Sequence, residues 1–152
     1  NYTKADGTGV VAAGGGKVLQ VVSAEYASET SSTTTTFIDT GLTVNITPTS
    51  TSNKVLVIAN QAGCWKGGED IYMRLELQRD GSSINAQWNV AQTGTTEDCG
   101  VGSTVMMALD SPSTTSAITY KTQQKLQSAG TQARTQINNS RSTITCLEID
   151  GT

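Results

Sequence analysis

The sequence predicts an all-β protein, and three observations carry this prediction. Apolar side chains recur at every second position through most of the chain after residue 17, as expected of half-buried strands. No segment shows apolar side chains at the 3.6-residue spacing of a helix. The chain holds 15 Ser and 25 Thr, and only 15% of its residues are charged, against about 25% in a typical domain. Because Thr is β-branched and favours a pleated, half-hydrated surface, this composition suits strands that expose hydroxyl groups.

The clearest expected element is a hairpin over residues 71–90. Apolar positions alternate with polar ones over 71–79 and again over 82–90, where Trp88 belongs to the apolar set. Asp80-Gly81 stands between the two runs, and Gly accepts the positive φ that a two-residue hairpin turn requires. We therefore expect two antiparallel strands joined at Asp80-Gly81, with Trp88 facing the core.

The same alternation predicts strands over 42–46, 101–109 and 118–126. Residues 55–59 and 144–149 instead carry apolar side chains on both faces, as in strands that are covered on both sides. We expect nine or ten short strands in total and predict an antiparallel β-sandwich of the jelly-roll kind. A sandwich on its own buries only one face of each sheet, so the surplus apolar faces indicate burial against a neighbouring subunit.

Length and composition indicate one domain preceded by an arm. At 152 residues the chain is long enough to bury a core without disulfides or metals. Residues 1–16 hold few large apolar side chains and end in three glycines, which is typical of a flexible arm or linker. We predict a β-sandwich over residues 17–152 and an N-terminal arm over residues 1–16, either a tether to another protein or a disordered terminus.

The charge pattern argues against two kinds of partner. The net charge is −3 and the ten Lys and Arg are scattered singly, whereas nucleic-acid binding needs a basic patch. No apolar run is long enough for a membrane-spanning helix, and the chain does not open with a secretory signal. We therefore expect neither nucleic-acid binding nor membrane insertion.

The three cysteines form no metal-binding or redox motif, because none is spaced Cys-x-x-Cys. Cys146 lies in the middle of an expected strand, and we interpret it as a small buried hydrophobic residue. Cys64 and Cys99 lie at strand ends and could pair across a loop, or could both stay reduced.

The sequence offers little catalytic chemistry. The chain contains no histidine, which removes Ser-His-Asp and Cys-His nucleophiles and histidine metal ligands. The acidic pairs Glu69-Asp70 and Glu97-Asp98 lie in glycine-containing loops, where solvated surface charge is their ordinary role. A glycosidase pair or a Ca²⁺ site built from these carboxylates is the alternative. We predict a protein that is not an enzyme and that needs no cofactor or metal.

Glu148 is the most unusual acid, because it shares a strand face with apolar residues. A buried carboxylate is costly unless it is paired or hydrogen-bonded. We predict a structural network in which Tyr120 or one of Arg74, Arg134 and Arg141 satisfies Glu148.

Trp65, Trp88, Tyr72 and Tyr26 are candidates for contact with sugars, since aromatic faces stack on pyranose rings. Trp65 sits in the segment Cys64-Trp65-Lys66-Gly67-Gly68, which we expect to be a loop between strands. This would place Trp65 and Lys66 on the surface beside the two acidic pairs, as candidates for contact with a ligand or a host. The alternative role of Trp65 is to close this loop over the core.

Four segments carry a family resemblance: residues 16–22, 39–57, 109–121 and 142–149. The third, LDSPSTTSAITYK, shows the end of one strand, a turn opened by Asp-Ser-Pro and the start of the next strand, as in a hairpin. Together the four resemble, in order, motifs of bacteriophage virion surface proteins, the family of tail-fibre or capsid-fibre knobs and decoration proteins. The resemblance implies a jelly roll similar to the tumour-necrosis-factor fold, assembly as a homotrimer, and a structural role for Glu148 at the trimer axis or at a strand end.

The resemblance also implies a function. We expect a non-catalytic knob on the virion surface, assembled in the host cytoplasm and attached to other virion proteins through the arm. It would act as a decoration that reinforces the capsid, or as a fibre tip whose loops 63–70 and 92–100 contact the host. The alternative is a carbohydrate-binding module that recognises host surface glycans, supported only by the aromatic residues.

Overall fold

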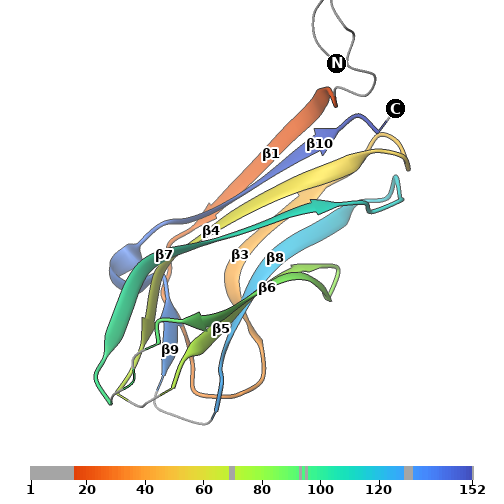
Figure 1. The fold of residues 1–152 in the computed structure, drawn as a ribbon. Coiled ribbons are helices and arrows are strands. Elements are labelled where there is room, and N and C mark those ends of the chain that lie inside the picture. Colours follow the sequence, from red (N-terminus) through yellow and green to blue (C-terminus); the bar gives the residue numbers. More distant parts are fainter. Residues whose placement is uncertain (1–15, 69–70, 93, 95, 129–131, 152) are drawn as a thin grey trace, which may run out of the picture.

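Two antiparallel sheets face each other across one core in the computed structural model of the chain (Figure 1). The structure describes residues 16–68, 71–92, 94, 96–128 and 132–151. Within these ranges there are ten strands, and the only helical element is the 3₁₀ turn Ile137–Asn139. The arm predicted over residues 1–16 lies, apart from Gly16, outside the described residues.

Each sheet has four long strands. Sheet A contains, in spatial order, β1 (Val18–Tyr26), β10 (Ser142–Ile149), β4 (Lys54–Lys66) and β7 (Cys99–Asp110). The short strand β9 (Ala133–Thr135) pairs with the last two residues of β4, and β2 (Thr30–Ser32) pairs with β9. Sheet B contains β3 (Ile38–Ile46), β8 (Ile118–Leu126), β5 (Met73–Arg79) and β6 (Ser82–Val90).

One pairing rule identifies the topology. β5 pairs with β6, β4 with β7, β3 with β8, and β1 with β10. The chain is therefore one long antiparallel hairpin with its tip at the β5–β6 turn. The two halves of this hairpin fold over together to form the sandwich. Eight strands paired in this way form a jelly roll, which confirms the predicted fold class.

Asp80 and Gly81 form the predicted hairpin turn at that tip. Both have positive φ, 46° and 85°, as a turn that matches the twist of its two strands requires. The strands on either side pair antiparallel, as predicted. The inward side chains Met73, Leu75 and Leu77 are fully buried, so the alternation in β5 located the core correctly.

The prediction that Trp88 faces the core is wrong, because its side chain is 60% exposed. Irregular pairing between β5 and β6 explains the error. Glu76 pairs with Ala86, so Ala86 and Trp88 point outward with Glu76. A register shift and a positive φ of 57° at Asn89 then return Val90 to the core. Strict alternation cannot detect such a bulge.

The Asp-Ser-Pro segment does not form the expected hairpin. β7 ends at Asp110 in sheet A and β8 begins at Ile118 in sheet B, so residues 111–117 cross from one sheet to the other. The Asp110 carboxylate accepts hydrogen bonds from Arg79 Nη1 (2.8 Å) and from the Tyr120 hydroxyl (2.7 Å). Because Arg79 and Tyr120 belong to sheet B, Asp110 ties the two sheets together.

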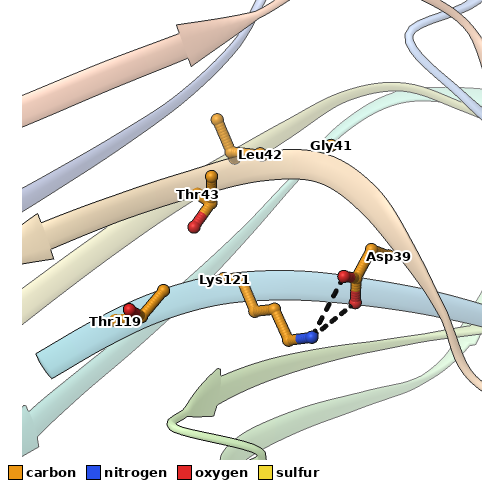
Figure 2. Close-up of a pocket in the computed structure, with 6 residues that line it drawn as sticks. All are labelled: Asp39, Gly41, Leu42, Thr43, Thr119 and Lys121. Carbon is orange, nitrogen blue, oxygen red and sulfur yellow. Dashed lines mark hydrogen bonds and ion pairs between the residues drawn. The ribbon is translucent and has the colours of Figure 1, made fainter.

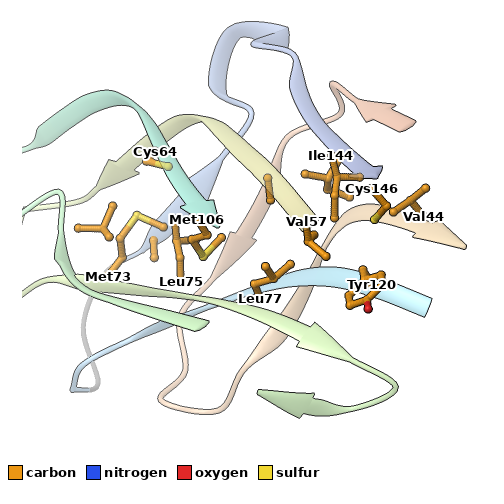
Figure 3. Packing of buried hydrophobic residues seen from close by; sticks show 14 of the residues in the cluster. Val44, Val57, Cys64, Met73, Leu75, Leu77, Met106, Tyr120, Ile144 and Cys146 are labelled. Atoms are coloured by element: carbon orange, nitrogen blue, oxygen red, sulfur yellow. The ribbon is translucent and has the colours of Figure 1, made fainter. Parts of the chain in front are cut away.

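The core between the sheets is mostly apolar (Figure 3). Cys64 and Cys146 are buried in it, and burial raises the pKa of each thiol to about 12. This agrees with the interpretation of Cys146 as a small hydrophobic residue. Cys64 and Cys99 are not paired, since all three cysteines are free.

A chain of buried hydrogen bonds also links the sheets. The hydroxyls of Thr40 and Thr122 lie 2.5 Å apart, and Thr122 Oγ1 donates to Gln61 Oε1 (2.8 Å). Gln61 Nε2 in turn donates to Ser142 Oγ (2.9 Å). Thr40 and Thr122 belong to sheet B, whereas Gln61 and Ser142 belong to sheet A. Such a network fixes how one sheet sits on the other, because any slip leaves buried polar groups without partners.

Candidate functional site

The outer face of sheet A carries a row of apolar side chains that crosses all four of its long strands. One row of cross-strand partners runs from Val21 in β1 through Leu147 and Leu56 to Leu109 in β7. Val21 is 57% and Leu109 58% exposed, while Leu56 and Leu147 are partly exposed. We name this surface the sheet A face, and it consists of Val21, Leu56, Ile58, Val105, Met107, Leu109 and Leu147.

The sheet A face contains the surplus apolar residues of the doubly apolar segments. In β4, Val55 and Val57 are buried between the sheets, whereas Leu56 and Ile58 point outward. No segment of the chain that the structure describes packs over these outward side chains as a further layer. Exposed apolar surface of this kind is a candidate site for association with another protein.

The outer face of sheet B is polar, and it contains a surface cavity of about 260 Å³ beside β3 and β8 (Figure 2). Lys121 Nζ donates to both Asp39 carboxylate oxygens, at 2.7 and 3.0 Å, and Gln123 Nε2 donates to Asp39 Oδ1. Burial would raise the pKa of Asp39, but the hydrogen bonds from Gln123 and Lys121 and the Lys121 charge lower it. The acid and base of this cavity are thus bound to each other. The cavity is lined by Asp39, Gly41, Leu42, Thr43, Thr119 and Lys121.

A second group on the same outer face combines cations with aromatic rings. The guanidinium carbon of Arg74 lies 3.5 Å from the centroid of the Trp88 ring and 5.7 Å from that of Tyr72. Lys125 Nζ lies 4.4 Å from the centroid of the Phe37 ring. Arg74 and Lys125 are direct cross-strand partners in β5 and β8. We name this group, Phe37, Lys125, Arg74 and Trp88, the cation–aromatic row.

Glu148 is a structural residue at the end of β10. Its side chain is fully buried. Its carboxylate accepts hydrogen bonds from Thr49 N (2.6 Å), Asn53 Nδ2 (2.6 Å) and Gln20 Nε2 (2.6 Å). Burial would raise the pKa of Glu148, but these hydrogen bonds outweigh it and lower the pKa to about 2. Glu148 thereby ties β1 and the β3–β4 connection to β10.

The partners predicted for Glu148 are wrong. Arg74 lies in the cation–aromatic row on the outside of sheet B, and Tyr120 donates to Asp110. Arg134 instead forms an ion pair with Glu29, and Arg141 with Glu25, both near the other end of β1. Neutral donors satisfy Glu148, and the sequence pattern gives no signal for a contact between residues so far apart in the chain.

Trp65 and Lys66 are not loop residues, because β4 continues to Lys66 and pairs there with β9 and β7. The Lys66 side chain is fully buried, so the prediction that it contacts a ligand or host at the surface is wrong. Trp65 is partly exposed, and the Arg134 guanidinium lies 4.7 Å from its ring centroid. The expected loop is therefore the end of a long strand.

The structure describes only one of the two acidic pairs that the sequence singled out. Glu97 and Asp98 are exposed, and the backbone at Gly68 lies beside Asp98, so the two predicted loops do meet. Glu69 and Asp70 lie outside the described residues. Within the described ranges, no group of three or more His, Cys, Asp or Glu side chains could hold a metal ion. No helix in the same ranges is long and apolar enough to span a membrane.

Comparison with known proteins gives similarities to solved structures only. No protein-family model matches the chain, and no curated protein matches it significantly. The chain is similar to VP2 of infectious bursal disease virus in the crystal structure of its subviral particle, with a TM-score of 0.49 and 14% sequence identity over 87% of this chain. The match covers 33% of the VP2 chain, so this chain spans about a third of the length of that protein.

Proposed function

We propose that this chain is a non-catalytic structural protein of a virus particle, a jelly-roll knob that forms a homotrimer through the sheet A face. The observation that carries the proposal is the row from Val21 to Leu109, in which four neighbouring strands all expose apolar side chains. Burying apolar surface stabilises an assembly by about 25 cal/mol per Å². Three copies can bury this surface around a three-fold axis, and most soluble homo-oligomers have closed point-group symmetry.

The resemblance to bacteriophage virion surface proteins supports the trimer and the virion location. The segments that carry it include two inter-element ties, Asp110 in residues 109–121 and Glu148 in residues 142–149. The knob would stand on the virion surface after assembly in the host cytoplasm, joined to other virion proteins through residues 1–16. It would act as a capsid decoration or as a fibre tip that uses loops 63–70 and 92–100.

The state of the hydrogen-bonded acids supports a non-catalytic role. Asp39 and Glu148 both have lowered pKa values, because hydrogen bonds stabilise their ionised forms. A general acid needs the opposite shift, toward a pKa near the working pH. Asp110 is held by Arg79 and Tyr120 between the sheets. These carboxylates serve the fold.

The test is the oligomeric mass of a double variant, Met107→Lys with Leu109→Lys. Both side chains are more than half exposed, so the substitutions leave the core intact but place charges in the proposed interface. Ala86→Lys, on the exposed outer face of sheet B, is the matched control. Light scattering after size exclusion should give a trimer for the wild type and the control, and a folded monomer for the double variant. A folded trimer in all three would overturn the proposed interface.

A second candidate function is recognition of host surface glycans. It is favoured by the exposed Trp88, which lies with Tyr72 and Arg74 on the outer face of sheet B. Trp65, the other tryptophan, is partly covered by Arg134 and is the weaker candidate. The experiment for this candidate is a titration with sugars that fit the cation–aromatic row.

A further inference from the structure

We propose that the cation–aromatic row binds an acidic sugar, a pyranose ring that carries a carboxylate. The inference deepens the second candidate function and does not depend on the trimer. Because the row lies on the outside of sheet B, it stays accessible when the sheet A face is buried. An acidic sugar has the two features that the row offers to a ligand, a negative charge and a ring with apolar C–H faces.

The topology assembles the row from four distant parts of the chain. Phe37 precedes β3, Lys125 is in β8, Arg74 in β5 and Trp88 in β6. Sheet B has these strands in the order β3, β8, β5 and β6, so the four residues lie side by side across the sheet. The result is two neighbouring cations with an aromatic ring on either side.

Arg74 is positioned to bind a carboxylate. Its guanidinium stacks on Trp88 and donates a long hydrogen bond of 3.5 Å from Nη2 to the Tyr72 hydroxyl. The buried Nε has no hydrogen-bond partner among the described residues. Because Nε is buried and stacking uses the face of the guanidinium, a carboxylate would approach the terminal Nη1 and Nη2 groups in the guanidinium plane.

Some cations of the described residues form ion pairs with carboxylates, and those of this row do not. Ion pairs between described residues join Arg79 with Asp110, Lys121 with Asp39, Arg134 with Glu29, and Arg141 with Glu25. Among the described residues, no acidic side chain forms an ion pair with either Arg74 or Lys125.

The nearest acid on β5 does not neutralise the row. Glu76 lies two residues from Arg74 on the same face and accepts a hydrogen bond from Gln78. Arg74 and Lys125 are directly opposite each other on adjacent strands, and like charges in that position repel. An anion bound between them would remove this repulsion.

The aromatic rings specify a sugar in preference to a bare anion. Trp88 is 60% exposed even though Arg74 covers one side of its ring, and Tyr72 is partly exposed beside it. A pyranose whose carboxylate meets Arg74 can therefore place C–H groups against exposed aromatic surface. A free phosphate ion would use the charges alone.

The experiment is a calorimetric titration of the full chain with trigalacturonate, with the neutral methyl ester of the same trisaccharide, and with inorganic phosphate. We expect trigalacturonate to bind, and both the ester and phosphate to bind about tenfold more weakly or less, since each lacks one of the two features. Arg74→Gln and Trp88→Ala should each weaken trigalacturonate binding by a similar factor. Lys121→Gln is the matched control, because Lys121 lies on the same face but is paired with Asp39.

Three results would overturn the proposal. They are equal binding of acid and ester, equal binding of trigalacturonate and phosphate, and no binding of trigalacturonate by the wild type. Arg74→Lys separates charge from geometry, because it keeps the cation but loses the planar donor edge. The mass of every sample is measured in parallel, so a loss of sugar binding is distinguished from a loss of the trimer.

Discussion

The two sheets bury similar inner faces but differ in what they present outward. Sheet A exposes a row of aliphatic side chains, whereas sheet B exposes ion pairs, a small cavity and the cation–aromatic row. Only the inner faces are needed to hold the sandwich together. Substitutions between the sheets should therefore unfold the protein, and substitutions on the outer faces should change what it binds.

Gly41 should be the most sensitive position. Its φ is +87°, and a Cβ there would lie 2.3 Å from the ring of Tyr26 in β1, so Gly41→Ala combines backbone strain with a clash where β3 of sheet B meets β1 of sheet A. We expect a loss of about 3 kcal/mol in the free energy of unfolding, measured by urea denaturation.

Gly81 provides the control for that prediction. Its φ of +85° is nearly the same, but a Cβ there would meet nothing within 4 Å. Gly81→Ala should therefore show the backbone strain alone. Equal losses for Gly41→Ala and Gly81→Ala would mean that the contact with Tyr26 does not join the sheets.

Glu148 should make stability depend on acid pH. Its pKa falls from an ordinary value of 4.5 to about 2 on folding, so the carboxylate stabilises the fold fully above about pH 4.5. This contribution is lost as the pH falls toward 2. Glu148→Gln should cost about 1–3 kcal/mol at neutral pH, because it replaces an acceptor-only carboxylate that receives three or more hydrogen bonds.

The measurement is urea denaturation of the wild type and Glu148→Gln between pH 7 and pH 2. The difference between the two proteins should shrink as the pH falls. Asp98→Asn, an exposed acid, is the control and should show little difference at any pH. A gap between wild type and Glu148→Gln that stays constant down to pH 2 would contradict the hydrogen-bonded, ionised state of Glu148.

Replacing Thr122 should also lower the free energy of unfolding, but by less than replacing Glu148. Thr122→Val keeps the shape of the side chain but removes the donor to Gln61 Oε1, leaving that buried acceptor without its partner. We expect a loss of about 1–2 kcal/mol by thermal or urea unfolding. Thr43→Val makes the identical change at an exposed position of β3, where water can replace the long 3.3 Å hydrogen bond from Thr43 Oγ1 to the Tyr120 carbonyl, and should cost less than about 0.5 kcal/mol. Similar values for the two variants would show that the inter-sheet network adds nothing.

Side-chain alternation predicted the inner faces well, because each sheet has one side in the core and one side out. Tyr120, Thr122 and Gln124 in β8 are all buried, as their shared face requires. The same logic failed at Trp88, where a bulge reverses the face of the strand. It also failed at Lys66, because pairing with β7 and β9 extends β4 into the segment expected to be a loop.

The candidate site was harder to predict than the fold. The doubly apolar segment 55–59 correctly signalled a surplus apolar face, since that signal is local in the sequence. The cation–aromatic row joins residues 37, 74, 88 and 125, and only the order of strands in sheet B brings them together. The contact between Asp110 and Arg79 could not be predicted from local sequence either, because it depends on how one sheet lies over the other.

The most direct test of the account is the mass of the unmodified protein in solution. The row from Val21 to Leu109 is the basis for the proposed assembly, and an apolar surface shared by four strands should not remain hydrated when copies can meet. Native mass spectrometry at micromolar concentration should give three times the 15.9 kDa chain mass. A stable, folded monomer under the same conditions would contradict the proposal.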